Sequence, residues 1–378
     1  MARIRKHRSK WQVLYRDPAT KRERSAGVFN RKVDATRQLR AVEYKLEAGE
    51  WIDPTLQATL YADWARTWID TRSDLKPKTL DGYVSLLNSR ILPSFGDVRL
   101  RDIRAIDVEQ WVAGMAAGGL SPSRTRQAYN VLSSSLKAAV RSDMIRVNPA
   151  DGAKLPKIKI NEMRHLTPAE VETIANRVED QYEVLVYVLA YCAIRAGEAV
   201  ALKRKNVNIV RSELRVVESA TEINGRIEFG ATKNRRNRNV TVPKFLVKRV
   251  EEHLTSYVAQ DPDALVFGSP LGGPLRLSNF RHRVWTPALE GTDLEGVRIH
   301  DLRHTAASIL INQGLHPKIV QQHLGHSSIV VTMDRYGHLY PSDTERVQDA
   351  LDAAFETGLV GPTTPSVEPE ADQMQTGA

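Results

Sequence analysis

The segment between residues 300 and 338 constrains this chain most, because it concentrates imidazole, guanidinium and phenol side chains between helix-patterned runs. Three short motifs carry these groups: His300-x-x-Arg303, Leu324-Gly325-His326 and Asp334-Arg335-Tyr336-Gly337-His338. Because the intervening sequence has helical periodicity, helices and the turns between them are predicted to present the polar side chains.

Three short helices are predicted in this segment. Apolar residues recur at steps of three and four over residues 301–313, which predicts a helix with His300 and Arg303 on one face. Pro317 can open a second helix, because proline suits the first helical position. A third helix near residues 328–336 would deliver the tyrosine.

The chemistry of these groups favours an anion over a metal. His300 and His304 have the spacing of a ligand pair, but Arg303 would lie beside any bound cation and no carboxylate completes the set, so zinc is not expected. A guanidinium among imidazoles suits a phosphate. A tyrosine beside such a site can attack phosphorus, which divides one difficult displacement into two easier ones.

Together the three motifs resemble the active-site signature of the tyrosine recombinases, specifically the phage-type integrases. This family also has an upstream arginine and a lysine in a hairpin turn. The matching stretches are Ile194-Arg195-Ala196-Gly197-Glu198, and Thr232-Lys233-Asn234 followed by Val240-Thr241-Val242-Pro243. One departure is Ala193, where the family usually has glycine, which concerns the fit of the backbone and not the chemistry.

The resemblance implies a reaction. Tyr336 would attack the scissile phosphate, form a 3′-phosphotyrosyl link and release a 5′-hydroxyl. Because the bond energy is kept, no metal or other cofactor is expected, and no Gly-x-x-x-x-Gly-Lys-Ser/Thr stretch occurs. The other implied site residues are Arg195 and Arg303 for the non-bridging oxygens, His300 and His326 for hydrogen bonds and proton handling, Lys233 for protonating the leaving oxygen, and Glu198 for supporting Arg195.

Length and charge indicate several domains and a polyanionic partner. The 378 residues suggest two or three domains, and the net charge is +9. Residues 1–54 carry 14 Lys/Arg against 7 Asp/Glu, whereas residues 351–378 carry 5 acidic residues and no Lys/Arg. The single cysteine, Cys192, is expected to be buried. No signal peptide or apolar run of membrane length is seen, so we expect a protein of the bacterial host cytoplasm, at the nucleoid and not in a membrane.

Residues 1–54 are predicted to form an arm-type DNA-binding domain. Trp11, Val13 and Tyr15 alternate with polar residues, a turn follows at 17–20, and the chain returns before an amphipathic helix. A three-stranded sheet with one helix resembles the arm-binding domain of phage integrases. The basic residues at the start are expected to be flexible phosphate contacts: Arg3, Arg5, Lys6, Arg8 and Lys10.

Residues 59–150 are predicted to form an all-helical core-binding (SAM-like) domain, after a linker at 55–59. Helices are predicted over 60–69, 77–92, 107–115 and 122–140, with Asp107 as the cap of the third. Lys76, Lys78, Arg124 and Arg126 lie near helix starts, where backbone amides also favour phosphate. Residues 151–164 read as an extended linker.

Residues 165–350 are predicted to form the α+β catalytic domain. Thr167 and Glu170 form a capping box at its start. A buried helix over 184–193 leads to Arg195 and a tight turn at Gly197, and strands at 213–218, 226–231 and 239–242 place Lys233 on a hairpin tip. Arg276 and Arg281 are further candidate DNA contacts. Residues 351–378 would contain the end of a C-terminal helix and a disordered acidic tail.

The sequence as a whole predicts a multidomain, mainly α protein with small β-sheets. The favoured function is a site-specific recombinase that integrates and excises a phage or mobile element. The expected partners are double-stranded DNA at core and arm sites, a homo-tetramer in the synaptic complex, a host DNA-bending protein and a directionality factor. Alternatives are a tyrosine recombinase of another role (chromosome or plasmid resolution, conjugative transposition), a type IB topoisomerase, and a non-catalytic DNA-binding regulator.

Overall fold

The computed structural model describes residues 2–17, 21–47, 58–159, 163–232, 237–340 and 344–359. The chain divides into two compact units, residues 1–162 with 221–228, and residues 163–220 with 229–378. Several predictions concern residues outside the described ranges, namely most of the 55–59 linker, Lys233 and the acidic tail from residue 360 onward. No helix in the described ranges is both long and apolar enough to cross a membrane.

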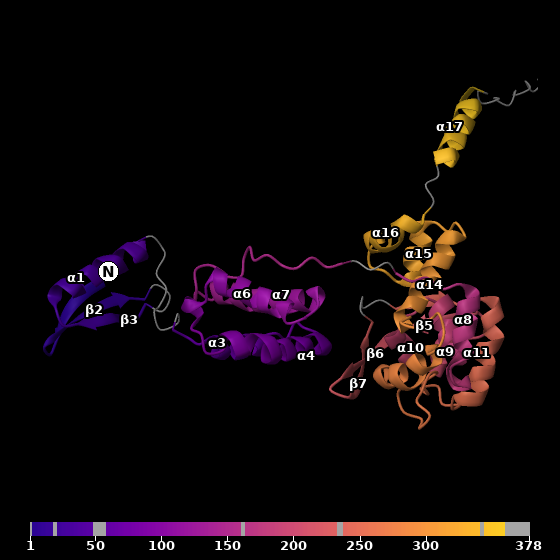
Figure 1. The fold of residues 1–378 in the computed structure, drawn as a ribbon, viewed down its shortest axis with the longest axis horizontal. Helices are drawn as coiled ribbons and strands as arrows, with labels where there is room; N and C mark the ends of the chain where they lie inside the picture. Colours follow the sequence, from indigo (N-terminus) through magenta and orange to yellow (C-terminus); the bar gives the residue numbers. More distant parts are fainter. Residues whose placement is uncertain are drawn as a thin grey trace, which may run out of the picture. The chain divides into compact units, whose positions relative to one another are not determined.

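The chain starts with the predicted sheet and helix. Strands β1 (Ala2–His7), β2 (Lys10–Arg16) and β3 (Glu23–Phe29) form an antiparallel sheet in the order β1-β2-β3. Helix α1 (Lys32–Glu47) packs on this sheet (Figure 1). Val13 and Tyr15 of the central strand are buried, as are Ala35 and Val42 of the helix, and Leu14 between Val13 and Tyr15 is buried too, so burial along β2 does not follow the predicted alternation.

One prediction for this domain is wrong. The basic start of the chain is not a flexible leader, because Arg3 and Arg5 belong to β1, whose six residues pair in register with β2. Backbone pairing fixes the strand, while the arginine side chains remain exposed.

Residues 58–159 form the predicted all-helical block. Its elements are α3 (Tyr61–Asp70), α4 (Pro77–Leu86), the π-helical turn η1 (Leu87–Ile91), α5 (Leu92–Phe95), the 3₁₀ turn η2 (Leu100–Asp102), α6 (Ala105–Ala117) and α7 (Pro122–Arg141). Trp64 and Trp68 are core residues, and Trp64 Nε1 donates to Ser135 O over 2.9 Å. Asp107 is not the cap of α6, since its carboxylate accepts from the backbone N–H of the cap residue Arg104 over 3.0 Å.

The second unit begins at the predicted capping box, in which Thr167 N–H donates to Glu170 Oε2 over 2.7 Å. The elements that follow along the chain are α8 (Pro168–Ala175), α9 (Asp180–Tyr191), α10 (Ala196–Val200), the 3₁₀ turn η3 (Arg204–Asn206), β4 (Val207–Asn208), β5 (Glu213–Val216), β6 (Glu218–Ile223), β7 (Arg226–Ala231) and β8 (Arg238–Thr241), of which residues 221–228 in β6 and β7 belong to the first unit. Helix α9 is buried over most of its length, as its apolar sequence predicts.

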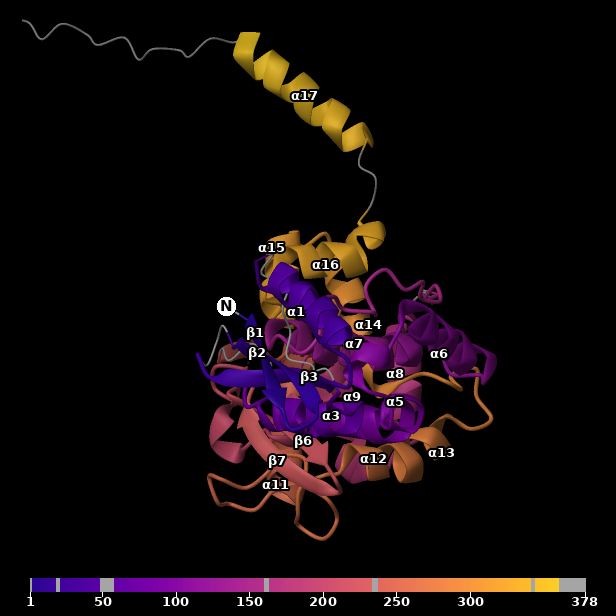
Figure 2. The same cartoon turned by 90° about the vertical axis from the view of Figure 1, so that its left-hand side faces the viewer.

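The rest of the unit is helical. It contains α11 (Lys244–Tyr257), α12 (Leu277–Phe280), the π-helical turn η4 (Arg281–Trp285), α13 (Thr286–Leu289), α14 (Ile299–Asn312), α15 (Pro317–Leu324), α16 (Ile329–Tyr336), the 3₁₀ turn η5 (Gly337–Leu339) and α17 (Thr344–Leu359). Helix α9 packs against α8, α11 and α14. Figures 1 and 2 show α15 and α16 side by side at one end of α14.

Strand pairing differs from the prediction. β7 pairs with β6, whereas β8 pairs with β5 in a separate sheet of order β4-β5-β8. Residues 232–237 therefore connect two sheets and are not the tip of a hairpin between two paired strands. The local sequence could not reveal this, because the partners β5 and β8 lie more than 20 residues apart.

Candidate active site

The first turn of α14 carries two of the predicted site residues, His300 and Arg303. Asp301 fixes this turn, since its carboxylate accepts from the backbone N–H of Arg298 over 2.8 Å and from the Arg298 guanidinium over 2.6 Å. A capping residue of this kind satisfies an otherwise unpaired helix-terminal amide. Arg303 then points into the domain and is buried, while His300 is exposed.

Arg303 is a buried cation held by carbonyl oxygens. Its Nη1 donates to Ala193 O, after α9, and its Nη2 donates to Leu324 O, at the end of α15. Burial and the nearby charge of Arg195 lower the pKa of Arg303 to about 9, which leaves the guanidinium charged at neutral pH. A buried charge is costly unless an opposite charge compensates it. Since no carboxylate in the described part of the chain pairs with Arg303, the site suits an incoming anion.

Glu198 lies between two further guanidinium groups. Its Oε1 accepts from Arg195 Nη1 at 3.0 Å and from Arg238 Nη1 at 3.1 Å. Its Oε2 accepts from the backbone N–H of Arg195 at 2.9 Å and from Arg238 Nη2 at 2.6 Å. Burial would raise the pKa of Glu198, but the contacts with Arg238 and Arg195 outweigh it and lower that pKa to about 2. Glu198 is thus ionised and hydrogen-bonded to both Arg195 and Arg238.

Arg195 is the N-cap residue of α10, so the chain after it continues as a helix and not as the predicted turn. Gly197, predicted to form a tight turn, lies inside α10. A side chain at Gly197 would meet the carbonyl oxygen of Ala220 at 2.6 Å, so glycine is needed there for close approach to β6.

His326 follows a glycine that lies against Arg238. Gly325 has a left-handed φ of 63°, and a Cβ there would lie only 2.7 Å from Arg238 Nε. The His326 ring is fixed by a 2.9 Å contact between Nδ1 and Thr332 Oγ1. Burial and the charge of Arg303 lower the pKa of His326 to about 3, so this imidazole is neutral at physiological pH.

Tyr336, at the end of α16, is only 1% exposed. Its hydroxyl lies 2.6 Å from His304 Nδ1, and its ring lies parallel to that of His326, with 6.4 Å between centroids. Burial raises the pKa of Tyr336, and the charges of Arg303 and Arg335 partly offset this effect. Burial also lowers the pKa of His304 to about 4, with a further contribution from His300. A neutral imidazole therefore holds the phenol.

Five of the six predicted catalytic residues come together within one unit: Arg195, His300, Arg303, His326 and Tyr336. The sixth, Lys233, lies outside the described residues. Two guanidiniums, two imidazoles and a phenol in one cluster are suited to attack on a phosphodiester.

Sequence reasoning missed three residues of this cluster. His304 had a visible signal, its spacing from His300, but that spacing was considered only as a metal-ligand pattern. Arg238 and Thr332 had no local signal, because their partners Glu198 and His326 come from other elements.

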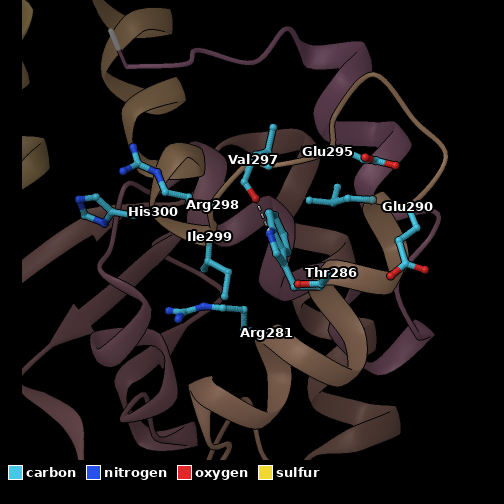
Figure 3. A pocket seen from close by; sticks show the side chains of 11 residues that line it. Arg281, Thr286, Glu290, Glu295, Val297, Arg298, Ile299 and His300 are labelled. Atoms are coloured by element: carbon cyan, nitrogen blue, oxygen red, sulfur yellow. Dashed lines mark hydrogen bonds between the residues drawn. The ribbon is translucent and has the colours of Figure 1, made fainter. Parts of the chain in front are cut away.

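A cavity of about 670 Å³ adjoins His300. Figure 3 shows Arg281 and Arg298 on the same side as His300, with Glu290 and Glu295 on the opposite side. Trp285 also lines the cavity, and its Nε1 donates to Val297 O over 2.8 Å. Arg281, a predicted DNA contact, therefore lines the same cavity as His300.

The other candidate DNA contacts are mostly exposed, and several also have partners within the chain. Arg3 pairs with Glu23, and Lys78 pairs with Asp81. Arg126 Nη2 donates to Pro156 O, so this arginine also anchors the segment after α7. The remaining exposed side chains in this set are Arg5, Lys6, Arg8, Lys10, Lys76 and Arg276.

Comparison with protein families gives two matches. Residues 164–343 match the family described as the phage integrase family, and residues 60–116 match the N-terminal SAM-like domain of phage integrases. These two ranges together cover more than half of the chain.

Relatives and solved structures agree with these matches. The chain is 28% identical to a prophage phiRv2 integrase of Mycobacterium tuberculosis, over 89% of this chain and 91% of the relative. It is 29% identical to an integrase of Mycobacterium phage FRAT1, over 78% and 91%. The fold is similar to that of the Tn1549 transposon integrase in complex with transposon right end DNA (TM-score 0.65, 19% identity, 80% of this chain and 100% of that chain). It is also similar to lambda integrase in a tetramer bound to a Holliday junction (TM-score 0.58, 18% identity, 86% and 95%).

Proposed function

This chain belongs to the phage integrase family of tyrosine recombinases, and from that premise we propose that it integrates and excises a phage or other mobile element by cutting and rejoining DNA. The observation that carries the proposal is the position of Tyr336, which lies in the same cluster as Arg303 and His326, parallel to the His326 ring. A nucleophile and the groups that bind its phosphate are thus supplied by one chain.

The proposed reaction proceeds in two displacements. The Tyr336 oxygen attacks phosphorus and forms a 3′-phosphotyrosine, while the bond to the 5′-oxygen breaks and Lys233 gives that oxygen a proton. The 5′-hydroxyl of a partner strand then attacks the phosphotyrosine and releases the tyrosine. Arg195 and Arg303 would bind the non-bridging oxygens, with His300 and His326 donating hydrogen bonds.

The free energies involved in catalysis explain why several hydrogen-bond donors would act together. Enzymatic accelerations correspond to about 8–23 kcal/mol, whereas removing one preorganised donor costs roughly 3–4 kcal/mol. The combined free-energy contribution of two guanidiniums, two imidazoles and a lysine is therefore of the size that such an acceleration requires. The positive charges of Arg303 and Arg335 already offset part of the burial that raises the pKa of Tyr336, which favours the phenolate that attacks phosphorus.

The remaining assignments complete the proposal. Residues 1–54 would bind arm sites, residues 59–150 and 165–350, which a linker at 151–164 joins, would each contact the core site, and four protomers would form the synaptic complex. A host DNA-bending protein and a directionality factor would control the direction of recombination, in the host cytoplasm at the nucleoid. The helix α17, whose Val347, Leu351 and Phe355 side chains are exposed, would dock on its own domain or on a neighbouring protomer.

A nicked suicide substrate tests the nucleophile. Wild-type protein should become covalently linked to the DNA. The short strand that carries the released 5′-hydroxyl diffuses away from the nicked substrate, so religation is blocked. Tyr336→Phe should bind the core site with similar affinity but form no adduct, measured as a shifted band on a denaturing gel.

Tyr340→Phe is the matched control, because Tyr340 also lies near the end of this segment and has a buried hydroxyl. This variant should form the adduct at a rate close to that of wild type. An adduct that persists in Tyr336→Phe and disappears in Tyr340→Phe would transfer the nucleophile to Tyr340.

A further inference from the structure

Arg238 belongs to the active-site cluster, although none of the roles above involves it. It is the first residue of β8, and its side chain is 14% exposed. Both of its Nη atoms donate to Glu198, whose side chain is fully buried. Such a two-point contact fixes both the position and the orientation of the carboxylate.

The charges in this contact network are unequal. One carboxylate, Glu198, lies between two guanidiniums, Arg195 and Arg238, so the group of three keeps one net positive charge. Without Arg238, Glu198 would neutralise Arg195, and only Arg303 would present an uncompensated charge to a phosphate. In a buried site of low dielectric constant, the loss of this positive charge would greatly weaken the electrostatic attraction for a phosphate.

Neighbouring residues hold Arg238 in this position. Gly325 lies against its guanidinium, where even a methyl group would be only 2.7 Å from Nε. Within the described ranges Arg238 Nε is buried and has no hydrogen-bond partner, so the fork of Nη atoms is directed to Glu198 and not to another protein acceptor. The same guanidinium contributes to the lowered pKa of Arg303, which places it within electrostatic reach of the phosphate-binding group.

We propose that Arg238 is a positioning residue that takes up the charge of Glu198, so that Arg195 keeps its positive charge for the scissile phosphate. Arg238 acts through Glu198 and does not itself touch the DNA. This role rests on the proposed function, because it concerns the charge that the reacting phosphate meets.

The test uses full-length protein and compares Arg238→Gln in two backgrounds. With Glu198 present, the substitution should lower the single-turnover rate of adduct formation on the suicide substrate by about 10- to 100-fold, with little change in affinity for core DNA. In a Glu198→Gln background, where there is no carboxylate to neutralise, the same substitution should change that rate by less than about threefold. Lys248→Gln, which removes an exposed charge on α11, is the control and should match wild type.

A neutral methylphosphonate at the scissile position supplies a second readout. Because it carries no negative charge, it should narrow the rate difference between wild type and Arg238→Gln. A role in folding alone would slow both substrates equally. If Arg238→Gln does not fold, the double variant, which has no unpaired buried carboxylate, can still overturn the role of Arg238 by losing more than about threefold in rate relative to Glu198→Gln.

The outcomes separate the two proposals. A wild-type adduct through Tyr336, together with an equal loss from Arg238→Gln in both backgrounds, overturns the role of Arg238 and leaves the proposed function intact. If Arg238→Gln forms the adduct at the wild-type rate, the role of Arg238 is likewise overturned and the proposed function remains intact. Failure of wild type to form any adduct overturns the proposed function, and the role of Arg238 with it.

Discussion

At the scale of single residues, the proposed nucleophile is constrained by its neighbours. Tyr336 is almost fully buried, and its hydroxyl has a short contact with His304 Nδ1. A buried hydroxyl that loses its partner costs about 1–3 kcal/mol, so His304 stabilises this arrangement. His304 is neutral over the physiological range, because burial and His300 lower its pKa to about 4. The cluster thus holds Tyr336 as a neutral phenol in the free protein.

We predict that His304→Phe weakens the acid dependence of stability. His300, His304 and His326 have pKa values of about 4, 4 and 3 in the folded protein, below the ordinary value of about 6.5. As the pH falls from about 6.5 to 4, the unfolded chain binds protons that the folded chain does not, so the free energy of unfolding decreases. His304→Phe removes one of these groups, and the slope should become shallower by up to one proton.

Denaturant unfolding at pH 7, 5.5 and 4.5 measures this slope. Tyr336→Phe is the control, because its phenol is neutral throughout this range and its removal breaks the same contact without removing a titrating imidazole. Burial lowers the pKa of other histidines too, namely His165, His253 and His323, so wild type should keep a residual slope in every variant. Equal slopes for wild type and His304→Phe would show that the pKa of His304 is not lowered in the folded protein.

The residue scale also shows how far sequence reasoning reached. His300, Arg303, His326 and Tyr336 were found because each lies in a short motif at a helix start or end. The contact between His304 and Tyr336 was not, because it depends on the rotation of α16 against α14, which no local pattern encodes. Only the tertiary packing of these helices sets that geometry.

At the scale of elements, the turn between α9 and α10 determines where Arg303 lies. Ala193 in this turn has a left-handed φ of 53° and is fully buried, and its carbonyl accepts from Arg303. This conformation explains why glycine is usual at the matching position in the family, since a Cβ costs about 1–2 kcal/mol there. The sequence showed that Ala193 replaces the usual glycine and that this replacement concerns the fit of the backbone. The positive φ of Ala193 is the physical reason.

We predict that Ala193→Gly changes the free energy of unfolding by less than about 1 kcal/mol. Relief of the left-handed strain is offset by the loss of a buried methyl group, about 0.8 kcal/mol, and by the larger backbone entropy of glycine. Ala193→Val should instead destabilise by about 3 kcal/mol or more, because a β-branched residue is an outlier at positive φ and overpacking adds about 1–3 kcal/mol.

Urea unfolding of both variants measures the difference. Ala175→Val, at a buried helical position in α8, adds the same volume without the backbone penalty and is the matched control. Equal losses from Ala193→Val and Ala175→Val would mean that packing alone, and not the backbone conformation, determines the cost at residue 193.

Elements with strong local signals were predicted well. α8, α15 and α16 begin at the proline or serine that the sequence indicated, and α15 ends at Gly325 in the left-handed conformation. Two features were not predicted, because tertiary pairing decides them. The basic start of the chain was not assigned to a strand and forms β1 by pairing with β2, and the strand β8 was predicted but its pairing with β5, across the intervening β6 and β7, was not.

At the scale of the whole molecule, the basic charge is unevenly distributed along the chain. Residues 1–54 carry an excess of seven positive charges out of a net charge of +9. In the N-terminal domain one sheet face packs on α1, and a row of polar side chains crosses the three strands, with Arg5 Nη2 donating to Gln12 Oε1 and Gln12 Nε2 donating to Ser25 Oγ. An exposed polar sheet face of this kind can enter a DNA groove and contact phosphates.

We predict that the N-terminal domain binds a DNA site distinct from the one that is cleaved. In the full-length protein, Arg5→Gln should weaken arm-site binding and reduce the slope of log affinity against log salt concentration by about 0.9, the value for one phosphate contact. Arg40→Gln removes an equal charge from the exposed surface of α1 and is the matched control, with no expected change in slope.

A protein that begins at Thr55 should still form the Tyr336 adduct on a core-site suicide substrate, yet lose arm-site binding and integrative recombination. Because one chain that holds both sites raises their effective concentration, full-length protein should assemble the paired complex at a lower concentration than the two pieces mixed. Gel-shift titrations with arm-only and core-only DNA at two salt concentrations measure these effects. Undiminished arm binding by the shortened protein, or equal slopes for Arg5→Gln and Arg40→Gln, would mean that this sheet is not the arm-binding surface.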